Sequence, residues 1–392
     1  MKNVKNICVV TGNRADYDLL YPLLVRIIND DDINLHLVAT GNHMSSEFGL
    51  TYKQIEDDGF IIKHKVEILP SSDTVEGVIK SMGLGLIGFA KVFDRINADI
   101  LILLGDRFEI FVAATAATVA RIPIAHLSGG ETTEGAFDEA FRHSITKMSH
   151  LHFTTTELYR NRVIQLGEHP ERVFNVGAFV MDNINEMQLL SKDNLQESMG
   201  FKFGKRNLLI TFHPTTLEDS SSEGQFNNLL TALSNTEDVQ LIFTKSNPDI
   251  GGRIINKMID EYIELNHQKA VSYSSLGRLR YLSVMQYVDG VVGNSSSGLV
   301  EAPSFKIGVV NIGNRQKGRA KSSSVIDCDT SILEIEKAIK VIFSESYKSK
   351  ISKIINIYES KDVSNKILSE IKSYNLDGIL MKKFYDSINL SN

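Results

Sequence analysis

Short, almost wholly apolar runs recur along this chain, and longer segments with apolar residues at every third or fourth position separate them. In the first half, the apolar runs cover residues 7–10, 35–39, 100–104 and 122–127, and residues 19–28 and 111–120 show the helical spacing. Unbroken apolar runs are typical of parallel strands buried on both faces. Strand, helix and strand in this rhythm predict a parallel sheet with right-handed crossovers.

The same rhythm returns in the second half, after a polar stretch at residues 190–205. Apolar runs at residues 208–212, 239–243, 290–293 and 307–311 predict a second parallel sheet, and the Lys-rich stretch 351–387 predicts helix. A chain of 392 residues exceeds the roughly 250–300 residues at which one hydrophobic core stops growing. We therefore expect an α/β protein with two Rossmann-like doubly wound domains that face a central cleft. The expected bounds are 1–180 and 181–365, followed by a helical segment, 366–392, that packs back on the N-terminal domain.

Charge and composition exclude several classes of function. The formal net charge of −6 argues against general nucleic-acid binding, which needs a basic surface to neutralise phosphates. Cys8 and Cys328 lie far apart in the sequence, so we expect reduced thiols, and the histidines show no metal-ligand spacing. The first apolar run is too short for a signal peptide or a membrane span. We therefore expect a cytoplasmic protein without a metal or a membrane partner.

Polar residues follow the predicted strands of the first half, at the edge where open α/β sheets bind ligands. Arg14 follows the first run, after a Gly-containing turn, and suits paired hydrogen bonds with a phosphate. Asp106 and Arg107 follow the run at 100–104. A structural ion pair is the ordinary explanation for such neighbours, because a buried carboxylate needs a cation.

A second polar group follows the run at 122–127. Gly129, Gly130 and Glu131 form a turn there, and Asp138 and Arg142 come next, four residues apart on one face of a predicted helix. An exposed salt bridge is the ordinary explanation for that spacing. The turn directly before the pair favours a functional site instead, because glycines let the backbone approach a ligand.

The second half carries a predicted anion-binding segment. Small residues follow the run at 290–293, a helix is expected next, and amides at a helix start attract phosphate. An ordinary serine helix cap is the alternative. Glu301 is placed to accept from ribose hydroxyls, and His213, Arg315 and Arg319 supply further polar groups after other strands. The residues that we expect to contact the ligand in this segment are Asn294, Ser295, Ser296, Ser297 and Gly298.

Taken in order, these segments resemble the UDP-N-acetylglucosamine 2-epimerase family, in its hydrolysing branch from sialic-acid and related nonulosonate pathways. The resemblance covers residues 5–327. It is carried by Thr-Gly-Asn-Arg-Ala-Asp-Tyr at 11–17, Gly-Asp-Arg at 105–107, Gly-Gly-Glu at 129–131, Asp-Glu-Ala-Phe-Arg-His-Ser-Ile-Thr-Lys at 138–147, Phe-His-Pro at 212–214, Ser-Asn-Pro-Asp-Ile-Gly at 246–251, Gly-Asn-Ser-Ser-Ser-Gly-Leu-Val-Glu at 293–301 and Gly-Asn-Arg-Gln-Lys-Gly-Arg at 313–319.

The resemblance implies a glycosyltransferase-B-like fold and a specific reaction. UDP leaves C1 as the C2 proton is removed, which gives a 2-acetamidoglucal, and water then adds to give a free sugar with inverted C2. No metal or nicotinamide cofactor is implied. The residues that match catalytic positions of the family are Asp106, Glu131 and Asp138 for acid–base chemistry and His213 near the diphosphate. Those that match nucleotide contacts are Arg14, Ser295, Ser296, Glu301 and Arg319. We also expect Arg107, Arg142 and Asn247 to contact the UDP sugar.

Several alternatives remain open from the sequence. The substrate is UDP-N-acetylglucosamine, giving N-acetylmannosamine, or UDP-2,4-diacetamido-2,4,6-trideoxyglucose for the legionaminic-acid pathway. His-Leu-Ser-Gly-Gly-Glu at 126–131 stands where the non-hydrolysing branch resembles His-Val-Glu-Ala-Gly, which favours the hydrolysing branch. A glycosyltransferase of the same fold is the alternative from another class. Either Asp106 or Glu131 is expected to remove the C2 proton, and a homo-oligomer, a dimer or a tetramer, is expected.

Overall fold

A computed structural model describes residues 4–46, 49–68, 74–134, 136–215, 221–246 and 251–386. The chain folds into two compact units. The first unit runs up to Glu131, resumes at Asp138–Asn183 and continues from Ser360 onward, whereas the second takes Thr132–Phe137 and Ile184–Glu359. No helix in the described ranges is long and apolar enough to cross a membrane.

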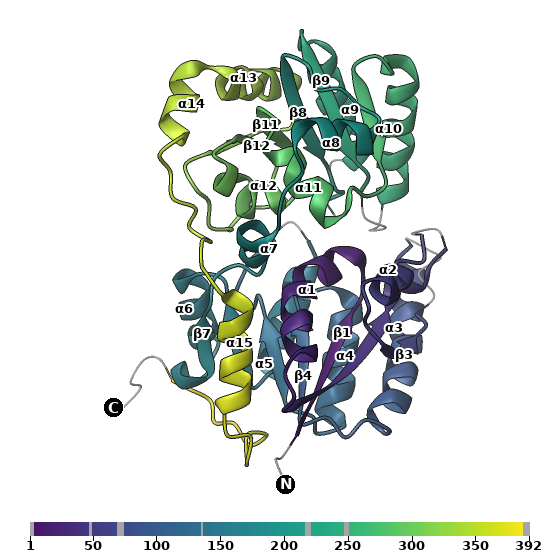
Figure 1. Cartoon of the computed structure of the whole chain (residues 1–392), viewed down its shortest axis with the longest axis vertical. Coiled ribbons are helices and arrows are strands. Elements are labelled where there is room, and N and C mark those ends of the chain that lie inside the picture. Colours follow the sequence, from purple (N-terminus) through teal and green to yellow (C-terminus); the bar gives the residue numbers. More distant parts are fainter. Residues whose placement is uncertain are drawn as a thin grey trace. The chain divides into compact units, whose positions relative to one another are not determined.

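The first unit is built on a parallel sheet, and the described residues contribute seven strands in the order β3-β2-β1-β4-β5-β6-β7 (Figure 1). The central strands β1, β4 and β5 are apolar and buried because helices pack on both faces of the sheet. The strands of this unit are β1 (Lys5–Thr11), β2 (Ile33–Thr40), β3 (Ile62–Val66), β4 (Ile100–Leu104), β5 (Ile124–Leu127), β6 (Leu151–Thr154) and β7 (Val173–Asn175). The helices are α1 (Arg14–Ile28), α2 (Tyr52–Asp57), α3 (Val75–Phe93), α4 (Phe108–Val119), α5 (Asp138–Met148), α6 (Glu157–Gln165), α7 (Val180–Glu186, which runs into the second unit) and α15 (Val363–Ser373), with short 3-10 turns η1 (Gly41–Met44) and η2 (Pro170–Arg172).

The second unit repeats this architecture with a sheet of six described strands in the order β10-β9-β8-β11-β12-β13, again all parallel. Its strands are β8 (Arg206–Thr211), β9 (Val239–Thr244), β10 (Ala270–Tyr273), β11 (Gly290–Gly293), β12 (Gly308–Ile312) and β13 (Val325–Cys328). The helices are α8 (Lys192–Met199), α9 (Ser222–Ser234), α10 (Gly252–Asn266), α11 (Gly277–Met285), α12 (Ser297–Val300), α13 (Ile332–Phe343) and α14 (Glu345–Ile351), with the 3-10 turn η3 (Ala302–Phe305). The predicted fold class, two Rossmann-like doubly wound domains, is confirmed.

Each sheet has one point where the strand order reverses. It lies between β1 and β4 in the first sheet and between β8 and β11 in the second. Crossover helices on the two sides of such a point cover opposite faces of the sheet, so the loops after the two strands diverge and leave room for a ligand. A ligand-binding site is therefore expected in the segments that follow these four strands.

The C-terminal segment packs against the first unit. Helix α15 lies beside α1, where Arg26 Nε donates to Asn365 Oδ1 over 2.9 Å (Figure 1). At the start of α15, the amides of Val363 and Ser364 donate to the buried carboxylate of Asp182 over 2.9 and 2.7 Å. The expectation of helix over 351–387 is only partly correct: residues 352–362 are not helical, α15 covers Val363–Ser373, and residues 374–386 form turns and irregular chain.

A buried cluster of charged side chains around Glu168 holds Lys382 in place. The carboxylate of Glu168 accepts from Lys147, from His152 and from Lys382, whose Nζ lies 2.9 and 2.8 Å from its two oxygens. Burial alone would raise the pKa of Glu168, but these hydrogen bonds and charges outweigh burial and lower the pKa to about 2. Glu168 is therefore a charged anchor for the C-terminal segment.

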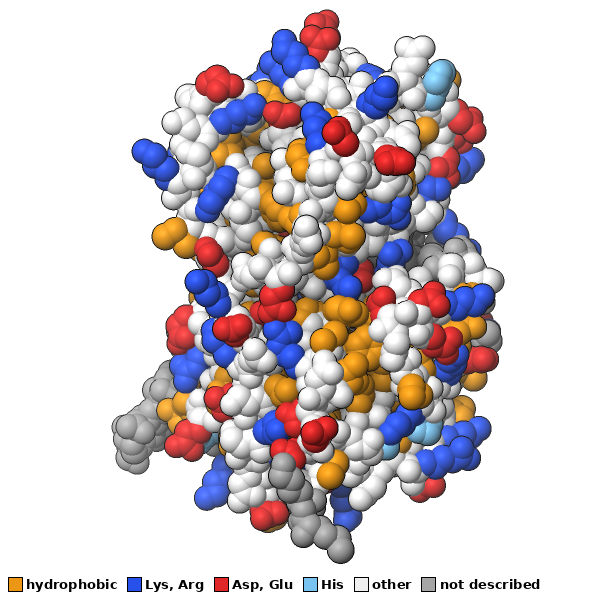
Figure 2. Space-filling model, viewed as in Figure 1, with side chains coloured by type: hydrophobic (Ala, Val, Ile, Leu, Met, Phe, Trp, Pro, Cys, Tyr) orange, Lys and Arg blue, Asp and Glu red, His pale blue; other side chains and the backbone are white. Residues whose placement is uncertain are grey.

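Charges of both signs are mixed on the face of the molecule drawn in Figure 2. On the face drawn in Figure 2, basic and acidic side chains are interspersed, and no continuous basic stripe is visible. A stripe of that kind is the usual electrostatic mark of a nucleic-acid-binding face.

Candidate functional site

A carboxylate–arginine cluster occupies the carboxyl-end edge of the first sheet. Arg142, on α5, is only 3% exposed, and its Nη2 donates to Asp106 Oδ2. Arg142 Nη1 lies 3.8 Å from Glu131 Oε2 and donates to the carbonyl of Ser128 over 3.3 Å. The structure thus brings together three of the predicted site residues from three separate segments.

The two carboxylates of this cluster differ in their surroundings. Glu131 is almost fully buried, and its Oε1 accepts from Thr155 Oγ1 over 2.9 Å while Oε2 faces Arg142. The side chain of Asp106 is 18% exposed, and its Oδ2 is the oxygen that contacts Arg142. Asp106 is therefore the carboxylate of the pair that a ligand reaches more readily.

The turns that present these carboxylates are fixed by their neighbours. His126 is fully buried, and its Nε2 hydrogen-bonds the carbonyl of Gly105 over 2.8 Å, directly before Asp106. Burial lowers the pKa of His126 to about 3, so the ring is neutral at physiological pH. Gly130, directly before Glu131, has a φ of +78°, and a Cβ there would lie 2.4 Å from the carbonyl oxygen of Tyr159. Only glycine fits this close approach.

Arg14, Arg107 and Asp138 occupy the starts of three helices at the same edge of the first sheet. Arg14 begins α1, and its Nε lies 3.8 Å from Asp18 Oδ2. Arg107 caps α4, and its Nε lies 3.4 Å from Glu109 Oε1. Asp138 begins α5 and is half-buried. From α5, Arg142 forms ion pairs with Asp106 and Glu131.

In the second unit, Asn294 fixes the backbone of His213. Its Oδ1 accepts from the amide of His213 over 2.7 Å, and its Nδ2 donates to the carbonyl of His213 over 2.8 Å. The His213 ring is 7% exposed, and Nδ1 lies 3.2 Å from Ser246 Oγ. The amide of Asn294 is therefore engaged with protein, and this residue supports His213 across the reversal between β8 and β11.

The expected helix after the Ser-Ser-Ser segment is a single turn. Helix α12 covers only Ser297–Val300, because the chain turns into η3, where Pro303 lacks the amide that a continuing α-helix needs. Ser296 is the N-cap but makes no side-chain cap bond, and Ser295 Oγ accepts from the amide of Ser297 over 3.4 Å. One turn carries little dipole, so anion binding here depends on hydroxyl and amide groups.

Two close contacts define the shape of this segment. The hydroxyls of Tyr281 and Ser297 hydrogen-bond each other. Burial, and then the charge of Glu301, raise the pKa of Tyr281, so this phenol is uncharged and orients the serine. At Gly298, a Cβ would lie 2.9 Å from Val309 Cγ1, so this glycine allows α12 to pack on the sheet.

The loop after β12 reinforces the same region. Arg315 Nη1 and Gln316 Nε2 both donate to the carbonyl of Asn294, over 3.1 and 2.8 Å. Arg319 Nε donates to the carbonyl of Thr132 over 3.0 Å. Glu301 ends α12 and is half-buried. Asn247, the remaining predicted contact, lies outside the described residues.

Three residues of these regions were not predicted from the sequence: Gln316, Tyr281 and Glu109. Gln316 is one residue from a predicted contact, and Glu109 is an acid in the first turn of a helix after a strand, so both carry a positional signal. Tyr281 lies in the middle of α11, away from any strand end, and only the tertiary structure brings it to the serines.

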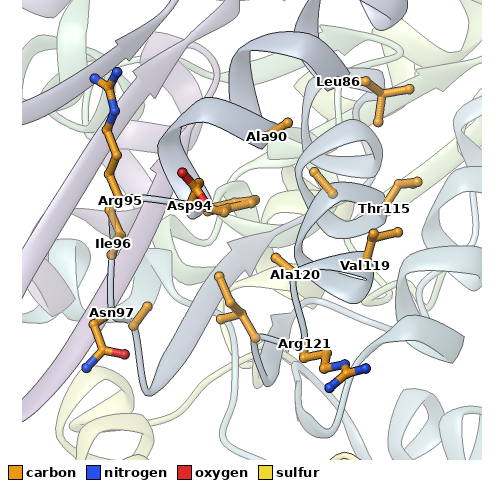
Figure 3. Close-up of a pocket in the computed structure, with 14 residues that line it drawn as sticks. Leu86, Ala90, Asp94, Arg95, Ile96, Asn97, Thr115, Val119, Ala120 and Arg121 are labelled. Carbon is orange, nitrogen blue, oxygen red and sulfur yellow. The ribbon is translucent and has the colours of Figure 1, made fainter.

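A hollow of about 710 Å³ lies elsewhere, at the amino-terminal edge of the first sheet (Figure 3). It is lined by the ends of α3 and α4 and the segments that lead into β4 and β5, among them Leu86, Arg95, Val119 and Arg121. Ligands of open α/β sheets bind at the opposite edge, where the carboxylate cluster lies. In the described part of the chain, no three His, Cys, Asp or Glu side chains are grouped to hold a metal ion.

Comparison with known proteins identifies the family. Residues 26–372 match the model of the UDP-N-acetylglucosamine 2-epimerase family, so the chain belongs to this family. It is 40% identical, over 97% of its length and 99% of the relative, to the GDP/UDP-N,N'-diacetylbacillosamine 2-epimerase (hydrolyzing) of Campylobacter jejuni. It is 39% identical, over 98% of both chains, to polysialic acid biosynthesis protein P7 of Escherichia coli. The crystal structure of UDP-GlcNAc 2-epimerase from Neisseria meningitidis bound to UDP-GlcNAc shares the fold, with a TM-score of 0.78, 16% identity and coverage of 94% of this chain and 100% of that one.

Proposed function

We propose that this chain is a hydrolysing 2-epimerase of UDP-2-acetamido sugars. The observation that carries the proposal is the cluster of Asp106, Glu131 and Arg142, in which a partly exposed carboxylate is held next to a buried arginine. A glycosyltransferase needs a nucleotide site but has no need of such a cluster for removing a proton from C2. The family membership supports the same assignment.

The first unit supplies the acid–base groups in this proposal. Asp106 removes the C2 proton, because it is the more exposed carboxylate and one oxygen is already positioned by Arg142. Electrons of the C2–H bond form the C1–C2 double bond, and the C1–O bond to UDP breaks. Glu131 orients Arg142, and Asp138 delivers a proton to C2 on the opposite face as water adds to C1.

The second unit holds the departing UDP. His213, Arg315 and Arg319 are donors that stabilise the diphosphate as it gains charge, and Ser295, Ser296 and Ser297 supply hydroxyl and amide donors. Glu301 accepts from the ribose hydroxyls. Arg14 and Arg107 of the first unit contact the same substrate.

Two substrates are proposed, and the relatives support each of them. The simplest is UDP-N-acetylglucosamine, which gives N-acetylmannosamine and UDP for a nonulosonate pathway of the sialic-acid type, in line with the polysialic acid relative. The second is the UDP derivative of N,N'-diacetylbacillosamine, which is 2,4-diacetamido-2,4,6-trideoxyglucose, in line with the Campylobacter relative. The two differ only at C4 and C6.

The test is a turnover assay in heavy water with each UDP sugar in turn. A hydrolysing 2-epimerase releases UDP and a free sugar with inverted C2, and the product carries deuterium at C2. Turnover with both sugars, compared as kcat/KM, decides the substrate. UDP release without deuterium at C2 would assign transfer or simple hydrolysis instead, and no UDP release from either sugar would refute the proposal.

A further inference from the structure

Glu109 lies beneath the strand ends where the first sheet reverses its order. It is in the first turn of α4, and its side chain is 0% exposed. Gly41, at the end of β2, has a φ of +58°, and a Cβ there would lie 3.0 Å from Glu109 Oε1 and 2.7 Å from the carbonyl oxygen of Gly12. The carboxylate therefore fills a space that two glycines leave open.

Glu109 forms an ion pair with Arg107. Its Nε lies 3.4 Å from Glu109 Oε1. Among the described residues, none hydrogen-bonds Glu109 Oε2, although this atom is buried. A buried carboxylate with so few hydrogen bonds depends on the charge of its cation, and the cation in turn is held by the carboxylate.

A second carboxylate shares this environment. Asp16 Oδ2 and Glu109 Cδ flank Gly12, at 3.5 and 3.6 Å from the position of its missing Cβ. The pKa of Asp16 is raised to about 7: burial is the largest cause, the charges of Glu109 and Asp106 add to it, and the charge of Arg107 opposes it. Several carboxyl groups thus surround the single guanidinium of Arg107. We infer that they set its position.

We propose that Glu109 is a positioning residue that holds Arg107 through Nε and so directs its two terminal nitrogens to the anionic substrate. The pair acts as a unit: a guanidinium fixed at Nε loses less freedom when its terminal nitrogens bind a phosphate or a carbonyl oxygen. The proposal rests on the proposed function in one respect, namely that Arg107 contacts the UDP sugar.

A double-mutant cycle of Glu109→Gln and Arg107→Met tests the proposal, because both changes keep the side chain near its original size. We expect Glu109→Gln to raise KM for the UDP sugar, and the Kd of UDP, about tenfold, with kcat changed less than about threefold. In the Arg107→Met background, the same change should alter KM and Kd less than about twofold, since there is no guanidinium left to position. Equal fold-changes in the two backgrounds would overturn the proposal.

Thermal unfolding of the same four proteins is an independent test of the proposal. Glu109→Gln should lower Tm in the parent, but it should raise Tm in the Arg107→Met background, because there it removes a buried charge that has lost its cation. Lower Tm in both backgrounds would mean that Glu109 only fills space. If Glu109→Gln lowers Tm in the parent and raises it in the Arg107→Met background, but leaves KM and Kd unchanged, the pair is purely structural. That result would also overturn the proposal.

Glu157→Gln is the matched control. Glu157 also lies in the first turn of a helix of this unit and pairs with an arginine, Arg160, but its side chain is 58% exposed. KM, Kd and Tm should stay at the parent values. If the parent turns over neither UDP sugar, the proposed function fails. The Kd of UDP and the Tm values of the four proteins still test whether Glu109 positions Arg107.

Discussion

Asp106→Asn isolates the charge that the proposed mechanism needs. The substitution keeps the shape of the side chain, and the amide still accepts a hydrogen bond from Arg142 if its oxygen takes the place of Oδ2. What is lost is the negative charge and the ability to take a proton. Glu131→Gln is the comparison variant, because Glu131 lies near the other terminal nitrogen of the same arginine.

The expected losses of stability and of rate differ in size. Removing one partner of a buried ion pair costs about 3–5 kcal/mol when the other charge is left alone. Here Glu131 still faces Arg142 at 3.8 Å, and Asp106 is 18% exposed, so we expect about 1–2 kcal/mol. A domain with about 5–15 kcal/mol of stability stays folded after such a loss. Loss of a general base lowers the rate about 100- to 10,000-fold, or about 3–5 kcal/mol in activation free energy.

Three measurements separate these effects: urea unfolding, turnover at 25 °C, and deuterium at C2 of the product. The Asp106→Asn protein should unfold at slightly lower urea and lose nearly all UDP release. Given 2-acetamidoglucal directly, it should still hydrate this intermediate, because C2 inversion requires proton delivery on the face opposite to Asp106. Glu131→Gln should lower turnover about tenfold and keep C2 exchange.

Three results would contradict the roles proposed for Asp106 and Glu131. If Asp106→Asn keeps turnover within tenfold of the parent, Asp106 is not the base. If Glu131→Gln instead abolishes elimination while Asp106→Asn does not, the two roles are reversed. Loss of hydration together with elimination would mean that Asp106 serves both steps.

Three further predictions follow from the described contacts. The pKa of Glu168 is lowered from 4.5 to about 2 in the folded protein, so its charge stabilises the fold fully above pH 4.5 and this contribution fades as pH falls towards 2. Glu168→Gln should therefore cost up to about 3 kcal/mol at pH 7, by urea unfolding, and detach Lys382; a cost that stays constant down to pH 3 would contradict this linkage. Tyr281→Phe should weaken UDP binding about two- to tenfold by calorimetry, because Ser297 loses the phenol that orients it, and unchanged binding would show that this hydroxyl does not contact UDP. Gly293→Ala should lower the free energy of unfolding by more than about 3 kcal/mol, since a Cβ would lie 1.9 Å from a carbonyl oxygen of the neighbouring strand; a Tm close to that of the parent would refute the packing described here.

Most core strands of the two sheets were predictable from the sequence. The apolar runs at 100–104 and 208–212 lie in β4 and β8, because a parallel strand covered on both faces must be apolar throughout. Strands β3, β6, β7, β10 and β13 were not predicted. The buried β6 has only four residues, and the other four strands lie at the edges of the two sheets. They are short and mixed in polarity, as edge strands with one open side are, and their residues carry no distinct pattern.

The partners of the site residues were less predictable. Spacing of four residues places Asp138 and Arg142 on one helix face, but it does not reveal that Arg142 also pairs with Asp106 and Glu131, 36 and 11 positions away in the chain. A buried arginine turns toward the sheet, where carboxylates from other segments converge, and helical spacing does not report on that direction. The bonds between the Asn294 amide and the backbone of His213, 81 positions away in the chain, likewise have no signal in the sequence.

The sequence by itself determined the two-sheet α/β architecture, the family, and the chemical types of the residues at the strand ends, because periodicity and ordered motifs are properties of the chain. The tertiary structure decided which of these residues meet. It paired Arg142 with Asp106 and Glu131, set Glu109 under Arg107, and brought Tyr281 to Ser297. The physical reason is that these contacts join segments whose distance in space depends on the strand order of each sheet and on close packing, and neither is written in local sequence.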